Sequence, residues 1–171
     1  DGKNDRYRHG DRLETGFDED DLRIVIGMIP AYKETEAAHD EAESSHMFEA
    51  RLAHIHEQIA EAKDALRDGD FERTFELGEM DSLSLAATTM TGPAGWVYWK
   101  PATLAIFEAV RDLREEGVPA YFSTDTGASV YVNTTSEYAD RVEEAVAAHA
   151  ETRVWNVGGP ARVLDPNEAL F

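Results

Sequence analysis

The run from Leu22 to Ile29 constrains the fold of this chain more than any other stretch of its sequence. Its eight residues read LRIVIGMI and are apolar on both alternations of an extended chain. Successive side chains of a strand point to opposite faces, so this pattern is typical of a strand that is covered on both faces. Pro30 ends the run. We therefore predict a strand over 22–29, buried between two layers.

Four stretches have the apolar spacing of amphipathic helices. In the longest, six apolar residues recur at intervals of four and three between Phe48 and Leu66, and Ser44 and Ser45 precede it as N-cap candidates. Asp70 is the N-cap candidate of the second helix. The apolar residues of this second helix are Phe71, Phe75, Leu83, Ala87 and Met90. Those of the third helix are Ile106, Phe107, Val110 and Leu113, and Gly117 and Pro119 end it. The inward-facing residues of the fourth helix are Tyr138, Val142, Ala145 and His149.

Three short apolar runs complete the predicted elements: Ala120–Phe122, Val130–Val132 and Thr152–Val157, followed by a short stretch over 162–164. The predicted order is β, α, α, α, β, β, α, β. This order is typical of an α+β fold, in which an antiparallel four-stranded sheet is backed by helices. We expect that domain over residues 21–171. Residues 1–20 are polar and lack an apolar face, so we interpret them as a remnant or linker of a missing N-terminal domain.

Composition excludes several classes of function. The chain has 16 Lys and Arg against 35 Asp and Glu, a net charge of −19, and no cysteine. This charge repels a nucleic-acid backbone, no apolar run is long enough to span a membrane, and disulfides and thiolate chemistry are absent. Twelve of the basic residues are arginine and four are lysine. An acidic, lysine-poor surface is typical of proteins that work in concentrated salt, although an ordinary acidic cytosolic protein is the alternative.

Asp125 is the candidate residue for chemistry. It lies between two predicted strands in the sequence STDTGAS, where Gly127 lets the backbone approach a ligand closely. The alternative is an aspartate that accepts hydrogen bonds from its own turn. The letters DTGAS also match the aspartic-protease motif, but that chemistry needs a second aspartate, and the chain has one copy.

Other motifs carry weaker signals. His54 and His56 lie two residues apart on a predicted helix and so point in different directions, which favours solvated histidines over a metal pair. We predict no metal site. The loop 91–101 has the glycines of Thr91-Gly92-Pro93-Ala94-Gly95, but without the lysine or the helix start of a phosphate-binding loop. Its aromatic residues, Trp96, Tyr98 and Trp99, are interpreted as a packing cluster.

The segment from Ser84 to Val132 resembles the C-terminal part of diphosphomevalonate decarboxylases. The matching pieces are Ala87-Thr88, Tyr98-Trp99, Pro101-Ala102-Thr103-Leu104, Pro119-Ala120-Tyr121-Phe122 and Asp125-x-Gly127, in that order. Two features differ from the family pattern. Ala86 stands where the family has histidine, and the family's Asp-Ala-Gly-Pro-Asn is replaced here by Asp-Thr-Gly-Ala-Ser, from Asp125 to Ser129. With the acidic surface, these differences resemble the haloarchaeal branch, whose members act on mevalonate 5-phosphate.

The resemblance implies an ATP-dependent decarboxylase of isoprenoid biosynthesis, acting on mevalonate 5-phosphate or 5-diphosphate. It implies that Asp125 acts as the catalytic base beside the C3 hydroxyl and that Thr126, Gly127 and Ser129 contact substrate. ATP and Mg²⁺ are expected from the family, as are a homodimer and a cytoplasmic location. The superfamily of galactokinase, homoserine kinase and mevalonate kinase carries its Gly/Ser-rich ATP loop in an N-terminal part, which is missing here.

Two alternatives stay open beside this interpretation. One is a mevalonate-type kinase without decarboxylation, and the other is a non-catalytic domain that binds a small molecule. Because the N-terminal part is the chain's expected partner, we expect the isolated chain to be inactive.

Overall fold

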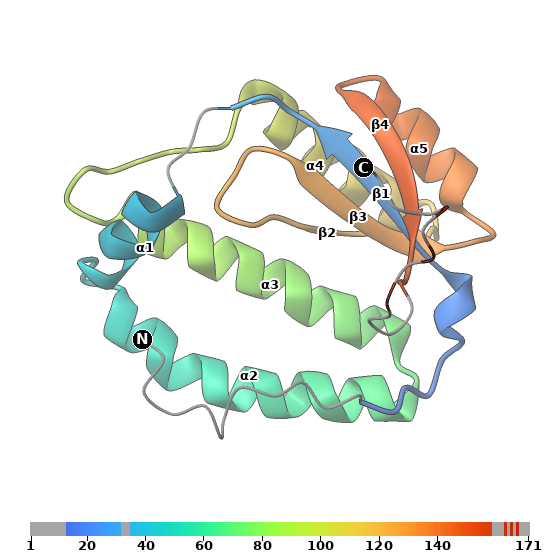
Figure 1. Cartoon of the computed structure of the whole chain (residues 1–171), viewed down its shortest axis with the longest axis horizontal. Coiled ribbons are helices and arrows are strands. Elements are labelled where there is room, and N and C mark those ends of the chain that lie inside the picture. The colour runs from blue at the N-terminus through green and yellow to red at the C-terminus, as the bar shows by residue number, and fades with distance from the viewer. Residues whose placement is uncertain (1–12, 32–34, 159–162, 164, 166, 168–171) are drawn as a thin grey trace.

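The computed structural model describes residues 13–31 and 35–158, together with 163, 165 and 167. A twisted sheet lies above a pair of long helices, and two further helices lie behind the sheet (Figure 1). In chain order the elements are a 3-10 turn η2 (Glu19–Asp21), β1 (Leu22–Met28), α1 (Thr35–Glu43), α2 (Phe48–Asp68), α3 (Phe71–Met90), α4 (Pro101–Glu115), β2 (Tyr121–Ser123), β3 (Val130–Thr135), α5 (Ala139–Ala147) and β4 (Glu151–Asn156).

The four strands form one antiparallel sheet in the order β2-β3-β1-β4. Val25 of β1 lies opposite Val132 of β3 on one side and Val154 of β4 on the other. The predicted α+β fold with a single antiparallel sheet is therefore confirmed. The apolar sequence of β1 is explained by its central position, where Val25 and Ile26 are buried on opposite faces.

The main core lies between the sheet and the helices α4 and α5. Phe107 of α4 stacks on Phe122 of β2 with ring centroids 3.9 Å apart. Gly27 allows α4 and α5 to come close to β1, because a Cβ at this position would lie 2.7 Å from Cδ1 of Ile106 and 3.0 Å from Cγ1 of Val146. The buried cluster consists of Val25, Ile106, Phe107, Val110, Leu113, Val118, Ala120, Phe122, Val130, Val132, Val142 and Val146.

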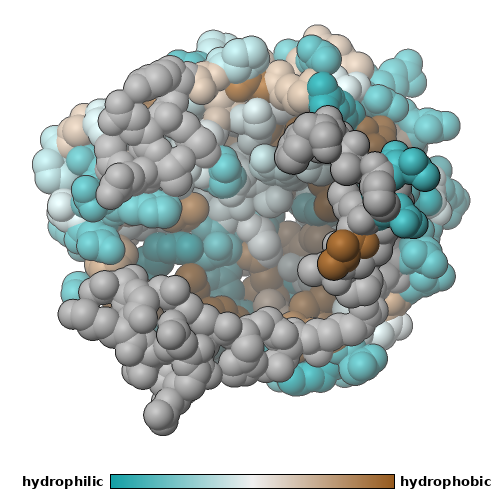
Figure 2. Space-filling view, in the orientation of Figure 1, coloured by the Kyte–Doolittle hydropathy of each residue, from teal (hydrophilic) through white to brown (hydrophobic). Residues whose placement is uncertain are grey.

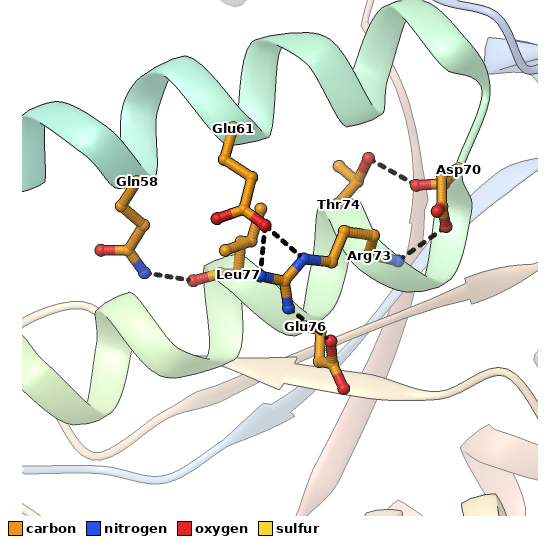
Figure 3. A network of polar contacts seen from close by, with 7 residues as sticks. All are labelled: Gln58, Glu61, Asp70, Arg73, Thr74, Glu76 and Leu77. Atoms are coloured by element: carbon orange, nitrogen blue, oxygen red, sulfur yellow. Dashed lines mark hydrogen bonds and ion pairs between the residues drawn. The ribbon is translucent and has the colours of Figure 1, made fainter.

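Helices α2 and α3 form an antiparallel pair that is held by polar contacts (Figure 3). The buried side chain of Gln58 donates from Nε2 to the carbonyl oxygen of Leu77 at 3.0 Å. Arg73 pairs with Glu61 across the two helices and with Glu76 on its own helix. Asp70 caps α3 by accepting a hydrogen bond from the Arg73 backbone N–H at 2.9 Å, as predicted.

The apolar stripe of α2 is less buried than its spacing predicts. Leu52 is 42% exposed and Ile59 is 48% exposed, whereas Gln58 and Ala65 face α3. Among the described elements α2 packs mainly on α3, so one narrow face of this outer helix is covered. Most hydrophilic residues on the face shown in Figure 2 lie toward its margin, and hydrophobic residues lie nearer its hollow centre.

Two local features differ from what the sequence predicted. Helix α1 was not expected from the sequence, because residues 35–43 carry few apolar side chains. Ser45 does not cap α2, which begins at Phe48. Its Oγ instead accepts from the Met47 N–H at 3.0 Å and shares a hydrogen bond of 2.7 Å with the Thr91 hydroxyl. Ser45 therefore ties the turn after α1 to the end of α3.

The predicted polar segment 1–20 is described from Leu13 onward. Phe17 packs against Phe71 and Phe75, with centroid distances of 5.9 and 6.4 Å, so this part of the segment lies on α3. Residues 1–12 and most of the stretch 162–164 lie outside the described residues. Within the described part of the chain, no helix is both long and apolar enough to cross a membrane.

Candidate active site

A small, partly open pocket lies where three distant segments of the chain meet. The last two turns of α3 contribute Leu85, Ala86, Thr89 and Met90; the loop before α4 contributes Trp96, Tyr98 and Trp99; and the loop between β2 and β3 contributes Asp125, Thr126 and Gly127. Asp125 carries a formal charge, and the other described lining residues are neutral. A single carboxylate therefore stands among apolar, aromatic and hydroxyl groups.

The Asp125 side chain is exposed and takes part in its own turn. Its Oδ1 accepts a hydrogen bond from the Gly127 N–H at 2.7 Å. This is the turn interaction that the sequence offered as the alternative to a functional role. The structure combines the two arrangements, because the same carboxylate also lines the pocket. The turn fixes one carboxylate oxygen with respect to the loop backbone.

Both ends of the loop that carries Asp125 are held by side chains from other elements. At its start, the Thr124 N–H donates to Oγ of Ser82 on α3 at 3.1 Å. At its end, the buried hydroxyl of Thr103 on α4 donates to the Ala128 carbonyl at 2.7 Å. The part of the loop between these two contacts is thus short and centred on residues 125–127.

The structure separates Ser129 from the other predicted site residues. Asp125, Thr126 and Gly127 line the pocket, whereas Ser129 is not among its lining residues. The Ser129 Oγ accepts from the Ile29 N–H at 3.1 Å, which joins the start of β3 to the chain just after β1. Ser129 stays a prediction as a substrate contact, and its described contact is structural.

The aromatic loop forms the wall that sequence reasoning assigned to packing alone. Trp99 packs edge-on against Phe107 at 5.1 Å, and Trp96 lies edge-on to Tyr98 at 5.9 Å. Glu41 of α1 fastens the turn before them, since its Oε1 accepts from the N–H groups of Ala94 and Gly95. The rings therefore pack as predicted and also line the pocket.

Sequence reasoning also missed the wall formed by α3. Its four lining residues are one, three and one positions apart in the sequence, which places them on one side of a helix: Leu85, Ala86, Thr89 and Met90. That spacing marks a face, but it does not distinguish a pocket wall from core. The signal that could have found this wall is Ala86, where the resemblance places a histidine in related proteins.

The described histidines do not gather into a metal site. His39, His46, His54 and His56 are exposed. Among residues 13–31 and 35–158 no group of three or more histidine, cysteine or acidic side chains comes together as a metal site would require. The pKa of Tyr121 is raised to about 12, chiefly by burial, but this tyrosine lies on β2 against Phe71 rather than in the pocket.

Comparison with curated proteins identifies one strong relative, and no family model matches the chain. The phosphomevalonate decarboxylase of Haloferax volcanii is 69% identical over 172 residues, which amounts to 99% of this chain and 53% of the relative. The chain therefore spans about half the length of the curated relative that it matches.

Solved structures show the same fold at low sequence identity. The mevalonate diphosphate decarboxylase of Staphylococcus aureus is 24% identical, with a TM-score of 0.78 over 84% of this chain and 46% of that chain. The mevalonate-3-kinase of Thermoplasma acidophilum, solved with mevalonate 3-phosphate and ADP bound, is 20% identical, with a TM-score of 0.71 over 81% of this chain and 43% of that chain. Together with the motifs between Ser84 and Val132, these findings show that the chain is similar to phosphomevalonate and diphosphomevalonate decarboxylases over about half of their length.

Proposed function

We propose that the protein to which this chain belongs catalyses the ATP-dependent decarboxylation of mevalonate 5-phosphate to isopentenyl phosphate. The observation that carries the proposal is Asp125, a carboxylate placed by a doubly held loop against neutral pocket walls. The strong relative is a phosphomevalonate decarboxylase, which supports the monophosphate over the diphosphate as the substrate. Residues 21–171 form the C-terminal, substrate-binding domain in this proposal, and residues 1–20 connect it to the remaining half.

Asp125 acts as the base in the proposed reaction. The Asp125 carboxylate would accept the proton of the substrate's C3 hydroxyl as that oxygen bonds to the γ-phosphorus of ATP, while the bond from the γ-phosphorus to the β,γ-bridging oxygen breaks and ADP leaves. Phosphate then leaves C3, and the electrons of the breaking bond to the carboxylate form the new double bond as CO₂ departs. Thr126 and the backbone at Gly127 contact substrate oxygens, and Ser129 holds the strand that follows.

The described residues do not fit an ATP or Mg²⁺ site. The pocket carries no basic lining residue among those described, and no cluster of metal-binding side chains is present there. We therefore assign no residue of this chain to hold either group. The nucleotide and its metal belong to the remaining half of the protein in this proposal, which is why the isolated chain should be inactive.

A kinase without decarboxylation is the second candidate, because the mevalonate-3-kinase of Thermoplasma acidophilum has the same fold as this chain. The deciding experiment supplies the full-length protein with ATP and either mevalonate 5-phosphate or mevalonate 5-diphosphate, and the products are identified by mass spectrometry. Isopentenyl phosphate with one equivalent of CO₂ supports the proposal. A stable product phosphorylated at C3, with no CO₂, would establish the kinase.

The proposal includes a homodimer in the cytoplasm, both expected from the family. Light scattering of the full-length protein at several concentrations measures its mass in solution. A monomer mass at every concentration would exclude the dimer.

A further inference from the structure

Among the described residues no strand pairs with the outer edge of β2, which is held by side chains of α3. β2 has three residues and pairs with β3 along one edge, where Tyr121 lies opposite Asn133 and Ser123 lies opposite Tyr131. Backbone N–H groups of a strand alternate between its two edges. Those of Phe122 and Thr124 therefore point away from β3, toward α3.

Two buried side chains of α3 accept these hydrogen bonds. The Phe122 N–H donates to Oε2 of Glu79 at 3.2 Å, and the Thr124 N–H donates to Oγ of Ser82 at 3.1 Å. Glu79 is 8% exposed and Ser82 is 6% exposed. The two residues lie three apart on α3, so they face β2 together.

Each acceptor is itself fixed. Arg114 of α4 donates two hydrogen bonds to Glu79, from Nη1 to Oε2 at 2.7 Å and from Nη2 to Oε1 at 3.0 Å. The Ser82 hydroxyl donates to the Gly78 carbonyl at 3.0 Å, which orients its lone pairs toward Thr124. The helix thus presents two rigid acceptors to the strand.

Asp125 follows Thr124 directly, so Ser82 holds the last backbone group before the proposed base. We propose that Ser82, supported by Glu79, is a positioning residue for Asp125. Ser82 is not among the lining residues of the pocket, and it acts by setting where the 125–127 turn begins. This inference rests on the proposed role of Asp125.

Removing the Ser82 acceptor should displace the turn and lower turnover. A misplacement of about 1 Å can lower a rate by roughly 10²-fold, so we expect Ser82→Ala to lower kcat by about 10- to 100-fold while KM changes by less than about threefold. The matched control is Thr74→Ala. The Thr74 hydroxyl donates to the Asp70 carbonyl at 2.7 Å, the same bond to the residue four positions earlier, but it lies near the other end of α3.

The double variant Ser82→Ala/Asp125→Asn separates positioning from a merely structural role. If Ser82 acts through Asp125, the double variant keeps the kcat of Asp125→Asn alone, because nothing remains to be misplaced. A structural role predicts that the two losses multiply. Ser82→Thr, which keeps the hydroxyl, should recover kcat.

The experiment uses the full-length protein with mevalonate 5-phosphate and ATP, and melting temperatures are recorded for every variant. If Ser82→Ala does not fold, Ser82→Cys replaces it, because a thiol fills the space but accepts hydrogen bonds weakly. Provided that Asp125→Asn is slow, either of two results overturns the inference. One is a normal kcat for Ser82→Ala, and the other is a double variant in which the two losses in kcat multiply. A normal kcat for Asp125→Asn instead overturns the proposed function.

Discussion

Glu79 shows how one residue joins three elements that are distant in the chain. It lies on α3, pairs with Arg114 of α4 and accepts from the backbone of β2. The hydrogen bond to Glu79 raises the pKa of Arg114, and burial opposes this rise. Sequence alone did not single out Glu79 because 35 acidic residues are present and most read as solvated helix exteriors.

Glu79→Ala should destabilise the fold strongly, because it leaves a partly buried guanidinium and a buried strand N–H without their acceptor. We expect a loss of about 3 kcal/mol in the free energy of unfolding, measured with urea at constant salt. Glu76→Ala is the matched control, since Glu76 also pairs with an arginine on α3 but is exposed. That variant should lose less than about 1 kcal/mol. Equal losses for the two variants would contradict this account.

Tyr121 gives the fold a dependence on alkaline pH. Burial is the main cause that raises its pKa from 10.0 to about 12, and Glu72 adds to the effect. The unfolded chain loses this phenolic proton near pH 10 while the folded chain retains it, so stability is full below pH 10 and falls as the pH rises toward 12. The loss over this range is about 2 kcal/mol.

Tyr121→Phe should remove that part of the pH dependence, since phenylalanine has no proton to lose. The measurement is the free energy of unfolding between pH 9 and pH 12 at fixed ionic strength, for both proteins. Any advantage of the unsubstituted protein over Tyr121→Phe in free energy of unfolding should shrink or reverse as the pH rises. Parallel curves would show that Tyr121 does not titrate differently on folding.

At the scale of elements, the distance between the sheet and its helices is set by Gly27. The side chains of Ile106 and Val146 occupy the space that a Cβ on β1 would need. We expect Gly27→Ala to cost about 1–3 kcal/mol through overpacking. Ile106→Val removes the Cδ1 atom nearest that position, so the double variant Gly27→Ala/Ile106→Val should be more stable than the sum of the two single losses predicts.

Thermal or urea unfolding of the four proteins in this cycle measures the coupling between the two sites. Additive losses would mean that α4 shifts away from β1 rather than meeting the new methyl group. The cycle therefore tests the packing of α4 on the sheet without touching the pocket.

The elements that sequence predicted well are those with one dominant local signal. β1 was recognisable because it is apolar on both faces, and α3 because Asp70 caps it and its spacing is regular. Helix α1 escaped because its residues are mostly polar, and the cap at Ser45 was wrong because Thr91, 46 residues away, shares its hydroxyl. Local sequence does not reveal such a long-range partner.

In the candidate site, too, some residues could be predicted from local sequence and others could not. Asp125, Thr126 and Gly127 stood out as an acid and a glycine between two strands, and they line one pocket. The α3 wall and the aromatic wall come from segments about 30 to 40 residues earlier, and their spacing equally suits core packing. Only tertiary contacts bring these three segments together. The separate location of Ser129 likewise depends on its pairing with Ile29.

For the whole molecule, the net charge of −19 on 171 residues should make stability depend on salt. Folding brings these charges together, and their repulsion is screened over about 10 Å at 0.1 M salt but over about 3 Å at 1 M. The strong relative comes from Haloferax volcanii, in line with the acidic, lysine-poor composition. We therefore expect the melting temperature to rise steeply between 0.1 M and 1 M KCl.

The control for this expectation is the same titration with sucrose, which stabilises compact states without screening charge. A rise with KCl that exceeds the rise with sucrose assigns the effect to screening. A melting temperature that does not change with KCl would contradict the interpretation of the surface as adapted to salt.

The central claim is that Asp125 acts as a base in the pocket, and Asp125→Asn in the full-length protein tests it most directly. The substitution keeps size and shape but removes the charge that accepts the C3 hydroxyl proton. Because general-base catalysis is worth about 10²–10⁴ in rate, kcat should fall at least about 10²-fold while the melting temperature stays unchanged. Asp112→Asn, on an exposed position of α4, should leave kcat nearly normal. Near-normal turnover of Asp125→Asn with both mevalonate 5-phosphate and mevalonate 5-diphosphate would contradict the account and leave Asp125 as a residue of its turn alone.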